Sequence, residues 1–240
     1  MSRVSIIIPF YNCPFIDQAI ESALNQTYKN VEVIVVNDGS TEYSEKIIPF
    51  KSQIRYLEKE NGGTASALNL GIKNSTGDYF TWLSSDDIYY KDKVLKQLTF
   101  MKEKNAYFSY TNYSLINADN HDIAQMAGKY FNNKIDVLQN LRNENHINGC
   151  TVMMKMQVFS AIGIFNENLK FTQDYDFWLR ALQNYEIYYL HDQLVKYRVH
   201  NRMGTRRFSE YLIKEVEILR ERYDDKLIRI INHEKKHMKN

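Results

Sequence analysis

The stretch VEVIVVNDGS, residues 31–40, decides how this chain is expected to fold. From Val31 to Val36 it is almost wholly apolar and β-branched, and the turn-forming sequence Asn37-Asp38-Gly39-Ser40 follows at once. A short apolar run that is closed by turn residues is typical of a buried strand. Strands buried on both faces occur mainly in parallel sheets that helices cover on each side. The stretch therefore predicts a strand in the parallel sheet of an α/β fold.

Strand-like runs of the same kind recur on both sides of this stretch, at residues 4–8, 54–57 and 79–83. Segments with helical patterns separate them, at residues 15–25, 64–73 and 91–104. Thr64 is the expected N-cap of the second helix. This alternation predicts a mostly parallel, Rossmann-like central sheet flanked by helices.

The second half of the chain is less regular. The pattern predicts a hairpin at residues 107–116 and 121–125, a strand at 149–154, a helix at 174–183, and strands at 186–190 and 193–199. From Phe208 onward, apolar residues recur every three or four positions between charges, as in an amphipathic helix. We expect one domain at 1–205, with halves at 1–105 and 106–205, followed by a helical tail at 206–240.

The composition limits the classes of function. The net charge of only +2 argues against nucleic acid as a partner. No run approaches the roughly 20 apolar residues that span a bilayer, and the amino-terminal sequence lacks a signal-peptide pattern. Cys13 and Cys150 lie far apart, which favours two free thiols in a reducing compartment. We therefore expect a cytoplasmic protein.

Turn-forming or polar segments follow all four predicted strands of the first half. They are Pro9-Phe10-Tyr11-Asn12, Asn37-Asp38-Gly39-Ser40, Asn61-Gly62-Gly63 and Ser84-Ser85-Asp86-Asp87. In open α/β sheets, ligands bind just outside the carboxyl ends of the strands. We therefore expect these segments to converge on one edge of the sheet and to form a ligand site there.

Asp86 and Asp87 need an explanation, because adjacent carboxylates at the end of a buried strand repel each other and resist desolvation. A divalent cation would resolve this conflict, since Mg²⁺ and Mn²⁺ prefer hard oxygen ligands and accept substrate phosphates. A second interpretation is that the pair stabilises the amino terminus of the helix at 91–104. The convergence of the other segments favours the metal site.

The motifs VSIIIPFYN, EVIVVNDGST, ENGGTASALNLGIKNSTGDYFTWLSSDD and TQDYDFWLR occur in this order. Together they resemble the family 2 glycosyltransferases of the GT-A fold, over about residues 4–202. The resemblance implies an inverting transfer of a sugar from a UDP-sugar to a hydroxyl of a glycan or glycoconjugate, aided by Mg²⁺ or Mn²⁺.

The resemblance also implies which residues contact the nucleotide-sugar. They are Pro9, Tyr11, Asn12, Asp38, Asn61, Gly62, Ser85 and Asp86. Within this set, Asp38 would accept the N3–H of uracil, although Asp38-Gly39-Ser40 is also ordinary turn chemistry. Asn61 and Gly62 match the loop that closes near base and ribose, and Gly62-Gly63 could equally be a flexible connection.

The metal motif of the family usually has the form Asp-x-Asp, and Ser84 stands here where the first Asp is common. Asp86 takes the second place and is the expected metal ligand, with Asp87 and His200 as further ligands. Mg²⁺ often keeps several waters and takes only one or two protein carboxylates, so the motif can still bind it. Nearby basic residues could neutralise a diphosphate leaving group or merely be solvated. They are Arg198, Arg202, Arg206 and Arg207.

An inverting displacement needs a base that takes the acceptor proton. Asp174 matches the base position of the family, after Gln173, where a Glu is common. Aromatic neighbours could raise its pKa by desolvation, which suits a base near neutral pH. Asp174 could also cap its helix. Asp176 would point elsewhere on the helix and is the weaker candidate.

Other functions stay open at this stage. One is a nucleotide-sugar or glycan-binding module without turnover. A sugar-phosphate nucleotidyltransferase fits less well, because no glycine-rich basic loop follows the first strand. The tail at 206–240 could pack on its own domain, pair with a second subunit, or contact the inner face of a membrane peripherally.

Overall fold

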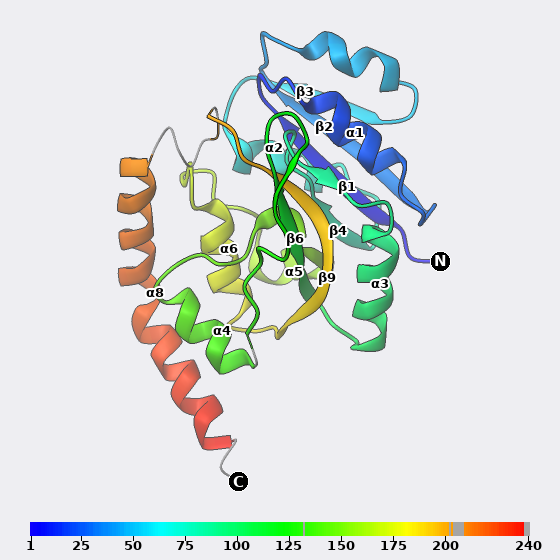
Figure 1. The fold of residues 1–240 in the computed structure, drawn as a ribbon. Coiled ribbons are helices and arrows are strands. Elements are labelled where there is room, and N and C mark those ends of the chain that lie inside the picture. The colour runs from blue at the N-terminus through cyan, green and yellow to red at the C-terminus, as the bar shows by residue number, and fades with distance from the viewer. Residues whose placement is uncertain (132, 202, 204–208, 238–240) are drawn as a thin grey trace.

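A computed structural model of the chain describes residues 1–131, 133–201, 203 and 209–237. The strands are Val4–Phe10 (β1), Val31–Asp38 (β2), Arg55–Lys59 (β3), Tyr79–Trp82 (β4), Ile88–Tyr89 (β5), Phe108–Ile116 (β6), Asp122–Ala124 (β7), Met153–Lys155 (β8) and Ile187–Arg198 (β9). Within the described chain they form one sheet, in the order β3-β2-β1-β4-β8-β6-β9-β5, with β7 paired to β6 (Figure 1).

Helices lie on both faces of this sheet. The α-helices are Ile16–Leu24 (α1), Thr64–Lys73 (α2), Lys93–Glu103 (α3), Lys134–Leu141 (α4), Gln157–Ile162 (α5), Gln173–Ala181 (α6) and Ser209–His237 (α8), and the 3-10 helices are Ser44–Phe50 (η1) and Gly149–Thr151 (η2). The predicted α/β architecture with a carboxyl-terminal helix is therefore confirmed.

The first half of the sheet is parallel, as predicted. β1 lies between β2 and β4 and runs parallel to both, with Ile7 opposite Ile34 and Trp82. Successive residues of β1 enter two different cores. Ile7 belongs to the core that also contains buried residues of α2, α6 and α8, while Ile6 and Ile8 belong to the core that contains buried residues of α1 and α3. Burial on both faces explains why these strands lack an alternation of apolar and polar residues.

The second half of the sheet is mixed rather than parallel. β8 pairs antiparallel with β4 and β6, whereas β6 and β9 are parallel. The predicted hairpin is present as β6 and β7, and the two strands expected at 186–190 and 193–199 are one strand, β9. The sequence pattern did not predict η1, β5, α4 or α5. The proposed division into halves at 1–105 and 106–205 stays a prediction.

The strand predicted at residues 149–154 is wrong in its first part. Residues 149–151 form η2, and only β8 is a strand. One local hydrogen bond and one distant contact accompany this turn. The side chain of Asn148 accepts a hydrogen bond from Cys150 N, and Gly149 lies against Trp82, where an added Cβ would be 2.3 Å from ring atom Cζ3. Both cysteines of the chain are buried free thiols, as predicted.

Two predicted helix caps are wrong. The N-cap of α2 is Gly63, with φ +89°, and Thr64 is already the first helical residue. The N-cap of α3 is Asp92, so Asp86 and Asp87 do not cap that helix. β5 separates the aspartate pair from α3, because Ile88 and Tyr89 pair with β9. A different role for the pair is therefore required.

The carboxyl-terminal helix α8 packs back on its own domain beside α4 and α6 (Figure 1). Its buried residues Leu219, Tyr223, Leu227 and Ile231 belong to the same core as the side chains of α6. This confirms the prediction that the tail packs on its own domain. Residues 206–208 and 238–240 of the predicted tail lie outside the described residues.

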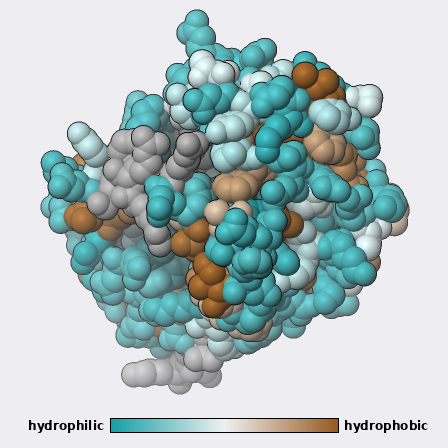
Figure 2. Space-filling view, turned by 45° about the horizontal axis from the view of Figure 1, so that its top comes forward, coloured by the Kyte–Doolittle hydropathy of each residue, from teal (hydrophilic) through white to brown (hydrophobic). Residues whose placement is uncertain are grey.

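The surface in Figure 2 is largely hydrophilic, with a narrow hydrophobic strip near its centre. Large apolar side chains that remain more than half exposed on α8 are Tyr211, Ile213 and Ile218. None of the helices in the described part of the chain has the length and apolar character needed to cross a membrane.

Candidate functional site

The loops that follow the first four strands contact one another, as predicted. Asn12 N donates to Ser40 Oγ at 3.1 Å, which joins the loops after β1 and β2. Cys13 Sγ donates to Ser85 O at 3.3 Å and links the first loop to the acidic segment. Asn61 Nδ2 donates to Asp38 O at 3.0 Å, so the loop after β3 joins the same edge.

Asp38 organises this edge of the sheet. Its side chain is buried, and Oδ1 accepts hydrogen bonds from Lys59 Nζ and Gly62 N, both at 2.9 Å. Oδ2 accepts from Gly63 N at 2.7 Å. The preceding turn needs Gly39, which has φ +75° and lies so close to Asn61 N that an added Cβ would be 2.8 Å away. Asp38 thus holds the loop at 61–63 in place.

Pro9 of β1 and the next predicted nucleotide residues, Tyr11 and Asn12 of the following loop, lie at the same edge. Pro9 is half-buried and pairs opposite Val36, while Tyr11 is 54% exposed, so its ring is available to a ligand. Asn12 has φ +44°, a conformation in which Asn is enriched. Its Oδ1 accepts hydrogen bonds from Thr41 N at 2.8 Å and Glu42 N at 3.0 Å.

Asp86 and His200 lie together although they are far apart in sequence. Asp86 Oδ2 is 3.0 Å from His200 Nε2, and the side chains are partly exposed, at 25% and 12%. The His200 ring stands edge-on to Phe15, with centroids 5.4 Å apart. One carboxylate and one imidazole suit Mn²⁺, and Mg²⁺ also accepts a single carboxylate when phosphates and water complete its shell. These two residues therefore fit the predicted metal.

Asp87 occupies a different environment. Only 1% of the residue is exposed, its Oδ1 accepts from Arg198 N at 2.8 Å, and its Oδ2 accepts from Cys150 Sγ at 3.0 Å. Ser84 Oγ lies 3.1 Å from the same sulfur. Burial raises the pKa of both Asp87 and Cys150. Asp87 therefore joins the strand end to β9 and η2.

The structure does not assemble the three predicted metal ligands as one group. Across residues 1–131, 133–201, 203 and 209–237, no cluster of three or more His, Cys, Asp or Glu side chains could hold a metal ion. Asp86 and His200 remain the pair that could bind one. The physical reason is that the Asp87 carboxylate faces Arg198 N and Cys150 Sγ in the interior, whereas the Asp86 carboxylate faces His200.

Arg198 has a structural role rather than either role expected from the sequence. It is fully buried, and Nε donates to Asp86 O at 2.7 Å. One terminal nitrogen donates to Gln18 Oε1 at 2.8 Å, and the guanidinium lies over the Phe15 ring, 4.3 Å from its centroid. Arg198 thus fixes the backbone of the acidic segment. Arg202, Arg206 and Arg207 lie outside the described residues.

Asp174, the predicted base, lies half-buried in the first turn of α6. Its Oδ1 accepts from Tyr175 N at 2.7 Å, and its Oδ2 accepts from Asn145 Nδ2 at 3.0 Å. Desolvation raises the pKa of Asp174 to about 6 despite these hydrogen bonds. The N-cap is Thr172, so the alternative that Asp174 caps the helix is wrong. In the described chain, the adjacent Gln173 Oε1 is buried without a hydrogen-bond partner.

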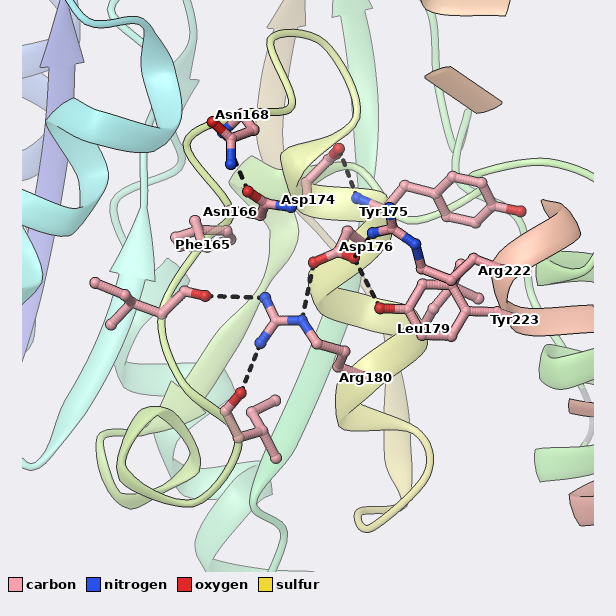
Figure 3. A network of polar contacts seen from close by, with 12 residues as sticks. Phe165, Asn166, Asn168, Asp174, Tyr175, Asp176, Leu179, Arg180, Arg222 and Tyr223 are labelled. Atoms are coloured by element: carbon pink, nitrogen blue, oxygen red, sulfur yellow. Dashed lines mark hydrogen bonds and ion pairs between the residues drawn. The ribbon is translucent and has the colours of Figure 1, made fainter. Parts of the chain in front are cut away.

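Asp176 points into the protein, in contrast to Asp174 (Figure 3). Its Oδ2 accepts from Arg180 Nε at 2.8 Å, and its Oδ1 accepts from the hydroxyl of Tyr223 at 2.8 Å. Arg180 also donates to the carbonyls of Ile162 and Ile164. Asp176 therefore ties α6 to α8, which agrees with its place as the weaker candidate for the base.

Two segments connect Asp174 to the nucleotide edge. Asn145 contacts Asp174, and Cys150 farther along that segment contacts Asp87 and Ser84. An extended chain spans at most about 3.6 Å per residue, so residues 145–150 reach no farther than about 18 Å. On the other side, Lys170 Nζ donates to Gly62 O at 3.2 Å. The predicted base and the predicted nucleotide loops thus share one region.

Sequence reasoning missed Asn145, Cys150 and Glu215 as members of this region. No motif marks them, because their partners are distant in sequence: Asp174 is 29 positions from Asn145, and Asp87 is 63 positions from Cys150. Cys150 had been noted only as a free thiol.

Comparison with known proteins gives a consistent result. The sequence model described as Glycosyl transferase family 2 matches residues 5–163. A glycosyltransferase of Rickettsia typhi without an assigned role is 42% identical over 208 residues, which are 84% of this chain and 65% of that protein. The chain thus spans about two-thirds of that relative's length. TuaG of Bacillus subtilis, named provisionally for teichuronic acid biosynthesis, is 32% identical over 90% of this chain and 89% of its own.

A solved structure has a similar fold. S. aureus TarS, residues 1–349, in complex with UDP has a TM-score of 0.69 and 21% sequence identity, and the match covers 91% of this chain and 64% of that one. The same protein in complex with UDP-GlcNAc has a TM-score of 0.67 and 19% identity, covering 90% of this chain and 66% of that one.

Proposed function

Because this chain belongs to glycosyl transferase family 2, we propose that it transfers a sugar from a UDP-sugar to a hydroxyl group of a glycan or glycoconjugate, with inversion at the anomeric carbon. The fold is the predicted GT-A type, since it matches TarS over most of the chain.

The observation that carries the proposal is the environment of Asp174. A base for an inverting transfer must be ionised near neutral pH and still have appreciable proton affinity. Desolvation raises the pKa of Asp174 to about 6, while hydrogen bonds from Asn145 and Tyr175 hold its carboxylate in one orientation. The side chain is half-buried rather than sealed, so an acceptor hydroxyl can approach it.

Asp86 and His200 are the proposed site for Mn²⁺ or Mg²⁺. A bound divalent cation would neutralise the charge that develops on the diphosphate leaving group. Asp86 is held for this role by Arg198, which donates to its backbone carbonyl at 2.7 Å. His200 lies 3.0 Å from the Asp86 carboxylate and can supply a nitrogen ligand from the end of β9. Asp87 supports this pair from the buried side.

The proposed donor is a UDP-sugar, which TarS binds as UDP and as UDP-GlcNAc. Tyr11 would stack or pack against the nucleotide, and Asp38 would accept the N3–H of uracil. An ionised carboxylate has about four acceptor positions, so Asp38 can hold its loop and still accept one more hydrogen bond. Asn61, Gly62 and Ser85 would line the base, ribose and phosphates. The name of TuaG, which refers to teichuronic acid biosynthesis, supports a glycan as the acceptor class.

Two further expectations belong to the proposal. The exposed side chains Tyr211, Ile213 and Ile218 of α8 would form the contact with a second subunit or with the inner face of a membrane. The location would be cytoplasmic, where UDP-sugars are used. Comparing the elution volume of the wild type with that of Ile213→Glu, with and without vesicles, tests both contacts.

The decisive experiment measures UDP release from a panel of UDP-sugars and oligosaccharide acceptors, with Mn²⁺, Mg²⁺ or EDTA. Asp174→Asn should lose nearly all turnover but keep its affinity for UDP, and Asp86→Ala should lose the metal-dependent part of that affinity. Asp119→Asn, on an exposed turn, is the control. Full turnover by Asp174→Asn would refute the assignment of Asp174 as the base. Tight UDP-sugar binding without turnover by the wild type would favour a binding module instead.

A further inference from the structure

Glu215 of α8 makes four hydrogen bonds to the turn that precedes α6. Its Oε1 accepts from Lys170 N at 2.9 Å. Its Oε2 accepts from Phe171 N at 2.9 Å, from Thr172 N at 3.0 Å and from Thr172 Oγ1 at 2.8 Å. A carboxylate on one helix thus receives the donors of the turn that begins another.

This contact holds the turn from which α6 starts. Two of its donors, Thr172 N and Thr172 Oγ1, belong to the N-cap residue, whereas Lys170 N and Phe171 N precede the helix. A carboxylate in front of a helix is also stabilised by the helix dipole. The N-cap residue of α6, Thr172, makes no side-chain hydrogen bond to its own helix. Its hydroxyl donates to Glu215 instead. Glu215 therefore fixes the start of α6 immediately before Asp174.

The same turn also reaches the nucleotide edge. Lys170 gives its backbone N–H to Glu215 and its ammonium to Gly62 O, at 2.9 and 3.2 Å. Gly62 N in turn donates to Asp38 Oδ1. One carboxylate of α8 thus orders a turn that touches the proposed uracil loop on one side and the proposed base on the other.

We propose that Glu215 is a positioning residue of the glycosyl-transfer site, which holds the turn at residues 170–172 so that Asp174 and the loop at 61–63 keep their productive arrangement. The catalytic consequence rests on the proposed function, whereas the ordering of the turn does not. The carboxyl-terminal helix is then part of the site rather than an appendage.

Other contacts hold α8 in place without Glu215. Tyr223 donates to Asp176 at 2.8 Å, and Arg142 of α4 forms a two-bond ion pair with Asp224, at 2.6 and 3.0 Å. The Arg142–Asp224 pair is a matched control, because it anchors the same helix with a carboxylate but does not touch α6. Replacing either acid by its amide removes one charge from α8.

The experiment compares Glu215→Gln with Asp224→Asn in the full chain. Glu215→Gln keeps the size of the side chain but has only one acceptor oxygen, so at least one of the backbone N–H groups at 170–172 loses its partner. We expect kcat to fall about 10- to 100-fold, as for small displacements of catalytic groups. The acidic limb of the pH–rate profile should move below pH 6, toward the ordinary Asp value of about 4, as water enters around Asp174. Asp224→Asn should leave both quantities unchanged.

Amide hydrogen exchange provides a readout that does not depend on turnover. The amides of residues 170–172 should exchange at least about tenfold faster in Glu215→Gln than in Asp224→Asn. Equal exchange in the two variants would overturn the proposal even if the protein has no transferase activity. Faster exchange with wild-type kcat and pH profile would overturn the catalytic consequence alone. A wild type without turnover would instead count against the proposed function.

Discussion

Replacing the proposed base should make the protein more stable at neutral pH. In the folded protein, desolvation raises the pKa of Asp174 from 3.8 to about 6. An acid whose pKa is raised by folding binds a proton more tightly in the folded state, so its ionisation destabilises the fold. The variant Asp174→Asn cannot ionise, and it should therefore gain stability wherever the wild type carries a charge at this position.

The magnitude follows from the two pKa values. One pKa unit corresponds to about 1.36 kcal/mol, so the ionised side chain costs at most about 3 kcal/mol above pH 6. Because Asp174 is only half-buried, solvent screening reduces this cost of ionisation. We therefore expect the free energy of unfolding of Asp174→Asn to exceed that of the wild type by about 1 to 3 kcal/mol at pH 8. At pH 4 the wild-type carboxyl is protonated in the folded state, and the expected gain falls to about 0.5 kcal/mol or less.

Urea unfolding of wild type and Asp174→Asn, followed by tryptophan fluorescence from pH 4 to pH 8, measures this difference. The gain should appear as pH rises from about 4 through about 6 and then level off. Asp119→Asn, which changes a carboxylate on an exposed turn, is the control for the removal of one negative charge. If the free energies of unfolding of Asp174→Asn and wild type differ by the same amount at pH 4 and pH 8, the argument that burial raises the pKa of Asp174 is refuted.

The remaining predictions concern side chains around the site. Tyr223→Phe removes the hydroxyl that donates to the buried Asp176, and urea unfolding should show a free energy of unfolding lower by about 1.5–3 kcal/mol. An unchanged urea midpoint would contradict a stabilising role of this hydrogen bond. Gly149→Ala places a methyl group 2.3 Å from the Trp82 ring, and thermal unfolding should show a free energy of unfolding lower by about 1–3 kcal/mol. A melting temperature equal to that of the wild type would refute the argument that only glycine fits against this ring. Asp38→Asn removes one of the two carboxylate oxygens that accept hydrogen bonds from Gly62 N and Gly63 N. Calorimetry should show the affinity for UDP falling at least about tenfold, or about 1.4 kcal/mol. An unchanged affinity would show that Asp38 is not part of the proposed uracil site.

Much of the amino-terminal half could be predicted because its signals are local. Apolar runs closed by turn residues mark the parallel strands, and the carboxyl ends of such strands meet by the geometry of the fold. This is why Asn12, Ser40, Asn61 and Asp86 could be assigned to one edge before any contact was known. The hydrogen bonds among their loops confirm that part of the prediction.

The division of roles among the acidic residues could not be predicted in this way. Asp86 and Asp87 are neighbours of the same type, but one lies beside His200 and the other is enclosed by Cys150 and Arg198. Which carboxylate becomes exposed depends on how β9 and η2 pack against the strand end. That packing arises from distant parts of the chain, and no local pattern encodes it.

By itself, the sequence determined strands β1 to β4 and helices α1 to α3, the family, and Asp174 as the candidate base. Each of these depends on neighbouring residues or on an ordered set of motifs. Only the tertiary structure decided that Asp87 is internal, that Arg198 is buried, and that Glu215 of α8 holds the turn before α6. The physical reason is that burial and hydrogen-bond partners are properties of the packed molecule. They set the charge and orientation of each carboxylate only after segments far apart in the chain have come together.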